Sequence, residues 1–284
     1  MYLTAKEFSI VINLALSSSQ LQSLTVPHMK LRPYMHLLIY GAIGIGKSTI
    51  LYEIGEKMKQ VPLKSITSAT LMGAVDQNSG EFSTPAIWNS VNSVMLIDEF
   101  HITKQDNNAR KILNDLLSLM ENAEYIKKLG YRCNNFKETK GDLYCKVEKN
   151  TIHCKTKFTL IVNTMMDLDR AKMQELHALM SRCMVIPYYL SHDELERFAF
   201  GENVYKFKKF KIKNKNVKIN AENYKKIVDF VKGKEIPQTR FLRLIGDLCR
   251  AYAVLGRIDK EVFEIIVKLA EVMPKPDQIA KEVY

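Results

Sequence analysis

The chain has 284 residues, 46% of them hydrophobic and 26% charged, which suggests about two domains that can each bury a core. No apolar run reaches the roughly 18 residues that a membrane span needs, so the composition argues against a membrane-spanning protein. The net charge of +11 favours a polyanionic partner, with lysine-rich faces turned to solvent as the plain alternative.

The first patterned segment is residues 4–22, where apolar side chains recur at helical spacing. Residues 9–16 and the serines after them resemble a signal peptide only weakly, because Glu7 beside Lys6 breaks the basic leader. We therefore expect a helix that covers the following domain.

Residues 35–60 predict a strand, a glycine-rich turn and a helix. The turn reads GAIGIGKS and meets the pattern G-x-x-x-x-G-K-S in full. Its glycines let successive backbone N–H groups form an anion nest at a helix N-terminus. Lys47 would reach the β- and γ-phosphates and Ser48 would hold Mg²⁺, whereas a chance glycine-rich turn would not need the flanking strand and helix. The expected nucleotide-binding residues are Gly41, Ala42, Gly44, Ile45, Gly46, Lys47, Ser48 and Thr49.

A pair of acids follows the next strand. Residues 65–93 are rich in turn formers and predict an irregular insertion. The apolar run 94–97 then ends in Asp98 and Glu99, as in a buried parallel strand with functional groups at its carboxyl end. We expect Asp98 in the Mg²⁺ shell and Glu99 to polarise the attacking water. A helix N-cap would explain one acid but not both.

Residues 107–120 predict an amphipathic helix, and residues 124–158 predict a long inserted β-hairpin rich in lysine. A turn centred near Thr139 would place Cys133 opposite Cys145. The hairpin is a candidate for binding a phosphate backbone, and the alternative is a solvated β-ribbon without a partner.

The cysteines show neither a C-x-x-C pair nor an even framework, so we expect free thiols. A zinc site in the hairpin is disfavoured because the candidate ligands have unusual spacing. Those ligands would be Cys133, Cys145, His153 and Cys154.

Two further polar residues flank predicted strands. Asn163 ends the buried strand at 157–164, and Arg182 directly precedes a short β-run that ends at Pro187. Taken alone, Asn163 can be interpreted as a turn former and Arg182 as a surface charge, without a functional role.

The pattern changes after Pro187. Residues 205–219 alternate lysine with apolar residues, which indicates a basic loop or edge ribbon. Helices are predicted at 221–232, 238–255 and 259–272. A strand–helix core followed by helices predicts a nucleotide-binding domain at 1–190 and a helical lid domain at 191–284.

The ordered motifs GAIGIGKS, LIDEF, IVNT, SRC and TRFLRLI resemble the AAA+ ATPases, and most closely the ATPase module of the minichromosome maintenance (MCM) replicative helicases. The turn-rich insertion and the motif Met-Glu-Asn followed by Ile-Lys-Lys-Leu-Gly also resemble that group. The resemblance covers about residues 1–275. It implies an α/β P-loop fold, with a parallel sheet flanked by helices, a C-terminal helical lid and a β-hairpin insertion.

The resemblance also implies roles. Asn163 is similar to the sensor-1 residue that positions water, Arg182 to the arginine finger that reaches a neighbour's γ-phosphate, and Arg240 to the sensor-2 arginine near the nucleotide. It implies ATP and Mg²⁺ as cofactors and a homo-oligomer, expected as a hexameric ring because a finger acting in trans needs head-to-tail contacts. DNA would pass through the central channel. The lysines expected to contact it are Lys127, Lys128, Lys137 and Lys140, of which Lys128 matches the family position best.

The chain departs from that family in its longer hairpin, and it leaves no room for an N-terminal DNA-binding domain or a C-terminal winged helix. A separate DNA-binding partner protein is therefore expected. We expect a cytoplasmic ATPase, or one in the host cytoplasm if a virus or plasmid encodes it, that translocates, unwinds or remodels DNA in replicating a small or mobile genome. The alternatives are a protein remodeller or transcription activator, and an ATP-switch initiator or loader with little turnover.

Overall fold

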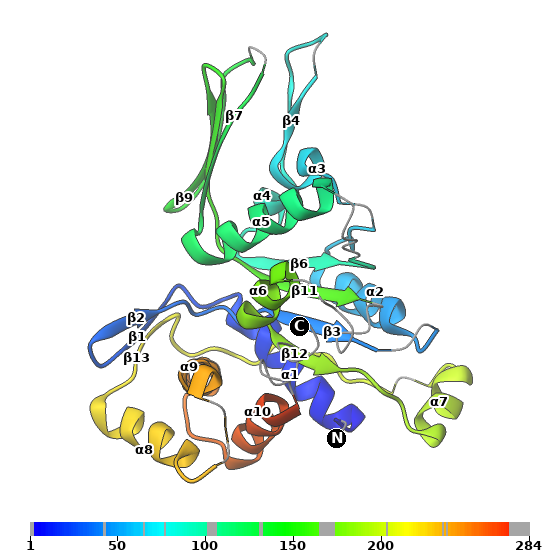
Figure 1. Ribbon diagram of the computed structural model, residues 1–284, viewed down its shortest axis with the longest axis vertical. Coiled ribbons are helices and arrows are strands. Elements are labelled where there is room, and N and C mark those ends of the chain that lie inside the picture. The colour runs from blue at the N-terminus through cyan, green and yellow to red at the C-terminus, as the bar shows by residue number, and fades with distance from the viewer. Residues whose placement is uncertain are drawn as a thin grey trace, which may run out of the picture.

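A computed structural model describes residues 3–41, 44–64, 66–76, 78–100, 107–130, 133–164, 174–202, 204–234, 236 and 238–272. In this part of the chain, a parallel sheet lies between helices, β-hairpins project from one side of the sheet, and further helices pack on the other side (Figure 1). No helix among these residues is long and apolar enough to cross a membrane.

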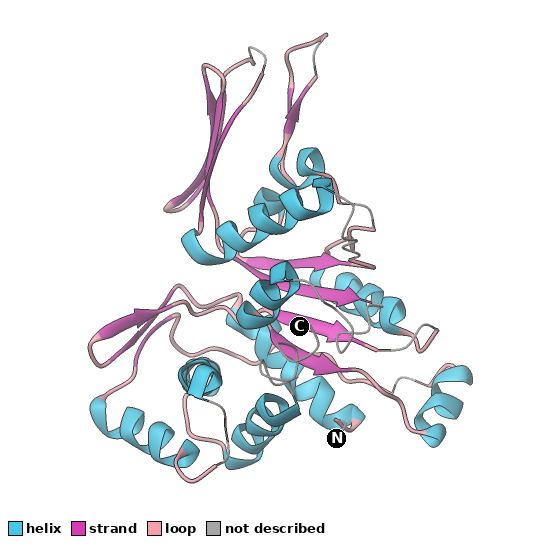
Figure 2. Cartoon of the chain, viewed as in Figure 1, coloured by secondary structure: helices cyan, strands magenta, loops and turns pink. Residues whose placement is uncertain are grey.

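The central sheet has the strand order β12-β3-β11-β6, and all neighbouring strands are parallel (Figure 2). Its strands are β3 (Leu37–Tyr40), β6 (Ser93–Ile97), β11 (Phe158–Thr164) and β12 (Met184–Pro187). A parallel bridge between Leu63 and Ile97 continues the sheet beyond β6. Every residue of β11 is buried, as expected for a parallel strand covered on both faces.

Helices cover both faces of this sheet. They are α1 (Ala5–Ser18), α2 (Lys47–Met58), α5 (Asn107–Asn122) and α6 (Gln174–Arg182). Alternate residues of β3 enter different cores, because successive side chains of a strand point to opposite faces. Leu37 and Ile39 pack in the core with α1 and α2, while Leu38 packs in the core with α5. The predicted N-terminal helix is α1, which begins with a capping box between Thr4 and Glu7.

The segment predicted as an irregular insertion breaks into short elements. They are α3 (Ser68–Met72), β4 (Ala74–Val75), β5 (Phe82–Ser83) and α4 (Ala86–Asn89). β4 and β5 pair in antiparallel fashion and form a small projecting hairpin (Figure 1).

The basic insertion is a four-stranded antiparallel sheet with the order β7-β10-β9-β8. Its strands are β7 (Glu124–Lys128), β8 (Phe136–Lys140), β9 (Leu143–Glu148) and β10 (Thr151–Lys155). The predicted register is wrong: the β8–β9 turn lies at Gly141 and Asp142, and Glu138 is opposite Cys145. The physical reason is Gly141, whose φ of 67° supplies the left-handed turn position.

The expectation of free thiols also fails for one pair. The β9–β10 register places Cys145 opposite Cys154, and the two form a disulfide. Cys133, Cys183 and Cys249 are free. The described residues hold no cluster of three or more His, Cys, Asp or Glu that could bind a metal ion.

The C-terminal part is helical, with boundaries close to the predicted ones. Its helices are α7 (His192–Ala199), α8 (Ala221–Val231), α9 (Gln238–Leu255) and α10 (Lys260–Val272). A small sheet joins this part to the N-terminal region, because β13 (Asn216–Lys218) pairs in parallel with β1 (Ser23–Val26), which pairs with β2 (Met29–Leu31).

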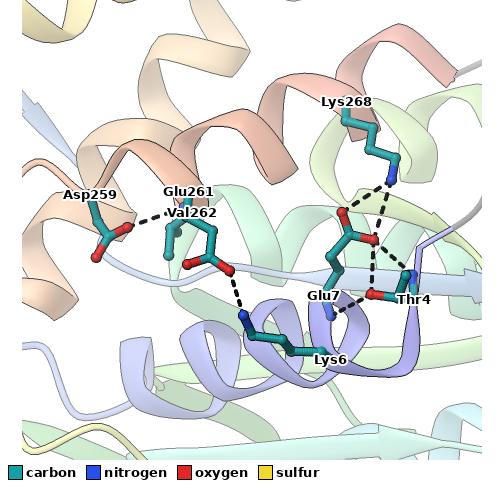
Figure 3. A network of polar contacts seen from close by, with 7 residues as sticks. All are labelled: Thr4, Lys6, Glu7, Asp259, Glu261, Val262 and Lys268. Atoms are coloured by element: carbon teal, nitrogen blue, oxygen red, sulfur yellow. Dashed lines mark hydrogen bonds and ion pairs between the residues drawn. The ribbon is translucent and has the colours of Figure 1, made fainter.

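α1 also fastens the C-terminal helices to the sheet. Figure 3 shows Lys6 paired with Glu261 at 2.7 Å and Glu7 paired with Lys268 at 3.1 Å, so charged side chains link α1 to α10. One hydrophobic core runs from α1 and β3 into α8, α9 and α10. The two predicted domains therefore share a continuous core.

Candidate active site

The glycine-rich loop connects the carboxyl end of β3 to α2, and two of its glycines have φ values that only glycine adopts at little cost. Gly44 has a φ of 81°, and Gly46, the N-cap of α2, has a φ of 86°. A Cβ on Gly41 would come within 2.5 Å of the Tyr188 carbonyl oxygen, so this position also requires glycine. Ala42 lies outside the described residues, and the other predicted loop residues line the turn and the first turn of α2.

Lys47 is buried beside this loop, and its Nζ donates a hydrogen bond to the Gly41 carbonyl oxygen at 2.8 Å. Burial lowers the pKa of Lys47, and the carboxylates of Asp98 and Glu99 oppose that shift. A cation at the N-terminus of a helix, with loop N–H groups around it, is the arrangement that binds phosphate.

Asp98 lies at the end of β6 and is only 3% exposed. Its Oδ1 accepts hydrogen bonds from the Ser48 hydroxyl at 2.9 Å and from the Asn163 amide at 2.7 Å. A hydroxyl and a carboxylate oxygen that meet beside a phosphate-binding loop suit Mg²⁺, which takes few protein ligands and completes its shell with phosphate and water. Ser48 and Asp98 are therefore the residues that would hold the ion.

Glu99 and Asn163 are joined at the carboxyl ends of neighbouring strands. The Glu99 N–H donates to the Asn163 side-chain oxygen, and Glu99 itself is exposed with a φ of 56°. The Thr164 hydroxyl donates to the Phe100 carbonyl oxygen at 3.0 Å and fixes the same junction. Sequence reasoning did not single out Thr164, although its position directly after Asn163 at a strand end was a signal.

Phe198 of α7 was also missed. A Cβ on Gly46 would lie 3.1 Å from its ring, so the ring packs directly on the phosphate loop. Nothing local in the sequence indicates this contact, because it brings together elements about 150 positions apart. The Glu194 carboxylate of α7 accepts a hydrogen bond from the Ala5 N–H at 3.1 Å, which ties α7 to the start of α1.

The two predicted arginines lie away from this loop. Arg182 ends α6 two residues before β12, at the amino end of the strands, where its guanidinium pairs with Glu121 and donates to the Ala178 carbonyl oxygen. Arg240 donates to the Ala270 carbonyl oxygen at 3.2 Å and lines a small cavity with Met184, the first residue of β12. Burial and the nearby Arg243 lower the pKa of Arg240. Both side chains lie at the opposite end of the sheet from the phosphate loop of their own chain, so Arg240 is not near that nucleotide site in this conformation.

Arg182 opens onto a cavity of about 370 Å³ between the sheet and α9, which we name the arginine cleft. Four arginines line it together with Glu121 and the buried Asp247; they are Arg32, Arg182, Arg243 and Arg250. Asp247 pairs with Arg250 at 2.8 Å and with Arg243 at 3.4 Å. Four guanidinium groups against two carboxylates leave an excess of positive charge in the cleft.

The four predicted DNA-contacting lysines occupy different positions on the insertion. Lys128 is exposed at the end of β7, and Lys137 is exposed on β8. Lys127 is half-buried and donates to the Ser68 hydroxyl at 3.1 Å, and burial lowers its pKa. Lys140 donates to the Trp88 carbonyl oxygen and lies over the Trp88 ring at 4.9 Å.

The parallel sheet, the phosphate loop after β3, the acids after β6 and the polar residue after β11 define a P-loop nucleoside triphosphatase. Residues 37–182 match the model of the ATPase family associated with various cellular activities (AAA). This match covers more than half of the chain, which therefore belongs to the AAA family and is an ATPase that binds ATP with Mg²⁺. A search of curated proteins found no match.

Proposed function

We propose that this ATPase uses ATP hydrolysis to translocate, unwind or remodel DNA as a ring of identical copies, in the manner of the MCM helicases and in the replication of a small or mobile genome. The observation that carries the proposal is that the β4–β5 hairpin and the four-stranded insertion β7–β10, called the larger hairpin below, project from the same side of the ATPase sheet (Figure 1). They are in contact, because the Asn134 N–H donates to the Gly80 carbonyl oxygen at 3.1 Å and the rings of Phe82 and Phe136 lie 5.0 Å apart.

The charges of the larger hairpin support a phosphate-backbone partner. Lys128 ends β7 beside Thr151 of β10, and Lys149 lies in the β9–β10 turn, so these lysines are close to one end of the insertion. Lys146, in contrast, is neutralised by Glu148 at 3.0 Å. Exposed lysines on a projecting hairpin suit contacts with phosphates, which carry no sequence information.

The arginine cleft supports an assembly of several copies. Because the cleft and the phosphate loop lie at opposite ends of the sheet, an ATP molecule whose phosphates enter the cleft would belong to another copy. The Arg182 side chain is 26% exposed, so part of its guanidinium is accessible to such a phosphate. Contacts of this head-to-tail kind close into rings.

In this proposal the loop N–H groups and Lys47 bind the β- and γ-phosphates of ATP. Mg²⁺, held by Ser48 and Asp98, would neutralise the phosphate charge. The carboxylate of Glu99 accepts a proton from the attacking water, whose oxygen bonds to the γ-phosphorus as the bond to the ADP oxygen breaks. Asn163 holds the Glu99 backbone during this step, and Arg182 of a neighbouring copy stabilises the charge on the transferred phosphate.

The test is the ATPase rate with and without single- and double-stranded DNA across a salt series. We expect DNA to stimulate hydrolysis and salt to abolish the stimulation. Lys128→Gln should reduce the stimulation, whereas Lys146→Gln, which removes an ion-paired lysine from the same sheet, should preserve it. A rate indifferent to DNA would instead favour a protein remodeller or transcription activator. Tight ATP binding without turnover would favour an initiator or loader, or a subunit that needs a separate DNA-binding partner.

A further inference from the structure

A lysine-rich segment leads from α7 to β13 and has no part in the site or the hairpins. We name residues 204–215 the lysine strap; it contains no acidic residue. Its six lysines are Lys206, Lys208, Lys209, Lys211, Lys213 and Lys215. The sequence predicted a basic loop or edge ribbon here, and the strap forms no strand of its own before β13.

Polar side chains of α1 hold the strap backbone. Asn13 donates to the Lys206 carbonyl oxygen at 3.0 Å and accepts from the Lys208 N–H at 2.6 Å. The Ser9 hydroxyl accepts from the Lys206 N–H at 3.2 Å, and the Ser17 hydroxyl accepts from the Phe210 N–H at 2.7 Å. Ser9, Asn13 and Ser17 are all buried, so three of the buried polar side chains of α1 fix this segment.

Aromatic side chains of the strap are buried, whereas its lysine side chains are exposed. Tyr205 and Phe207 are buried and their rings stack at 5.7 Å, and the Tyr205 hydroxyl donates to the Tyr188 hydroxyl at 2.8 Å. The lysines between and after these rings are exposed. No large apolar side chain of the strap is exposed.

None of the six strap lysines forms an ion pair with any residue that the structure describes. Some surface lysines elsewhere are paired; Lys226, for example, pairs with Glu222, and Lys232 with Asp229. A fixed row of unpaired cations repels itself and gains most from a polyanion laid along it.

We propose that the lysine strap is a second, sequence-independent binding surface for the phosphate backbone of DNA, separate from the hairpins; the proposal rests on DNA being the substrate. An extended chain advances about 3.3 Å per residue, so lysines two positions apart are separated by about 6.6 Å and the row extends for up to about 30 Å. That length matches about nine nucleotides along one strand of a duplex.

The burial of the aromatic rings of the strap indicates which kind of partner it can bind. Without exposed rings the strap offers no stacking platform for bases, and without exposed apolar groups it has nothing to insert into a bilayer. Its place also separates it from the hairpins: the strap follows α1 on the side of the helical domain, whereas the hairpins project from the other side of the sheet (Figure 1). The strap and the hairpins are therefore two separate surfaces of one copy.

The test compares two triple variants of equal net charge by binding to a fluorescent 30-mer DNA across a salt series. The strap variant is Lys206→Gln/Lys208→Gln/Lys211→Gln. Its matched control is Lys6→Gln/Lys226→Gln/Lys232→Gln, which removes three lysines that are ion-paired elsewhere. We expect the strap variant to bind at least ten-fold more weakly at low salt, with a slope of log affinity against log salt that is shallower by about 2–3. The control should bind like the wild-type protein.

Folding does not confound the comparison, because Lys206 and Lys208 contact α1 through backbone atoms, and these contacts survive the exchange to glutamine. Equal loss in both variants, or no loss in either, would overturn the strap proposal and leave DNA-stimulated ATP hydrolysis intact. Wild-type protein that binds anionic vesicles and no DNA would overturn both proposals.

Discussion

Replacing Asn163 by alanine tests how Glu99, the proposed general base, is held. This residue is 1% exposed at the end of β11, and its amide makes two hydrogen bonds. One goes to the Asp98 carboxylate at 2.7 Å, and the other accepts the N–H of Glu99, whose φ of 56° is unusual for a residue other than glycine. The substitution removes both bonds but keeps the hydrogen bond from the Phe100 N–H to the backbone oxygen of residue 163.

The magnitude follows from these two bonds. A hydrogen bond to a charged group contributes about 1.5–3 kcal/mol and one between neutral groups about 0.5–1.5 kcal/mol, so the free energy of unfolding should fall by about 3 kcal/mol. At about 2–4 °C per kcal/mol, the melting temperature should fall by about 6–12 °C. A general base contributes about 10²–10⁴ to a rate, so a misplaced Glu99 should lower kcat about 100-fold.

The assay is steady-state ATP hydrolysis beside equilibrium binding of a fluorescent ATP analogue, at a temperature where the variant is folded. Binding should stay within a few-fold while kcat falls. The matched control is Thr159→Val on the same strand, which removes a buried hydroxyl contact to Ser18 at 3.3 Å. It should lose stability but not activity. A kcat for Asn163→Ala within two-fold of wild type would refute the reasoning, and an equal loss in both variants would show that general destabilisation is the cause.

Four further outcomes are expected. Lys47→Ala should abolish ATP binding, and unchanged binding would contradict the phosphate-loop assignment. Glu99→Gln should bind ATP and stop hydrolysis; normal turnover would place the base elsewhere. Arg182→Ala mixed with wild-type protein should inhibit more than its share of copies, whereas additive activity would exclude a finger that acts in trans. Burial, and then the cations of the arginine cleft, lower the pKa of His36 to about 3. Because the unfolded state binds its proton at about pH 6.5, stability should fall as the pH drops from 6.5 towards 3, by about 2 kcal/mol at pH 5. His36→Asn keeps an acceptor for the Leu160 N–H and should remove that part of the acid sensitivity in denaturant titrations at pH 7 and 5; an unchanged pH dependence would contradict the buried neutral histidine.

Local patterns predicted much of the site. The phosphate loop and the strand that ends in Asp98 and Glu99 are determined by neighbours within a few residues, so their chemistry is readable from the sequence. The strand register of the hairpin was not predicted correctly, because the position of the turn depends on one glycine in a left-handed conformation, Gly141.

Contacts between distant segments could not be predicted in the same way. Ser9, Asn13 and Ser17 read as unremarkable polar residues of a helix, and their role appears only once residues 206–210 lie beside them. The arginine cleft likewise gathers residues from position 32 to position 250. No periodicity in the sequence carries that information.

α1 sets a mechanical constraint on any movement of the helical domain. Its N-terminus contacts α7 through the bond from Ala5 to Glu194, its charged side chains contact α10, and Ser18 at its other end contacts β11 through Thr159. A free hinge at the linker near residue 190 would have to break the contacts of α1 with α7 and α10 while the contact of α1 with β11 stays in place. We therefore expect the helical domain to close over ATP by a shear, in which its packed helices slide by small steps along α1. The lysine strap, whose backbone is bonded to α1, would stay with that helix.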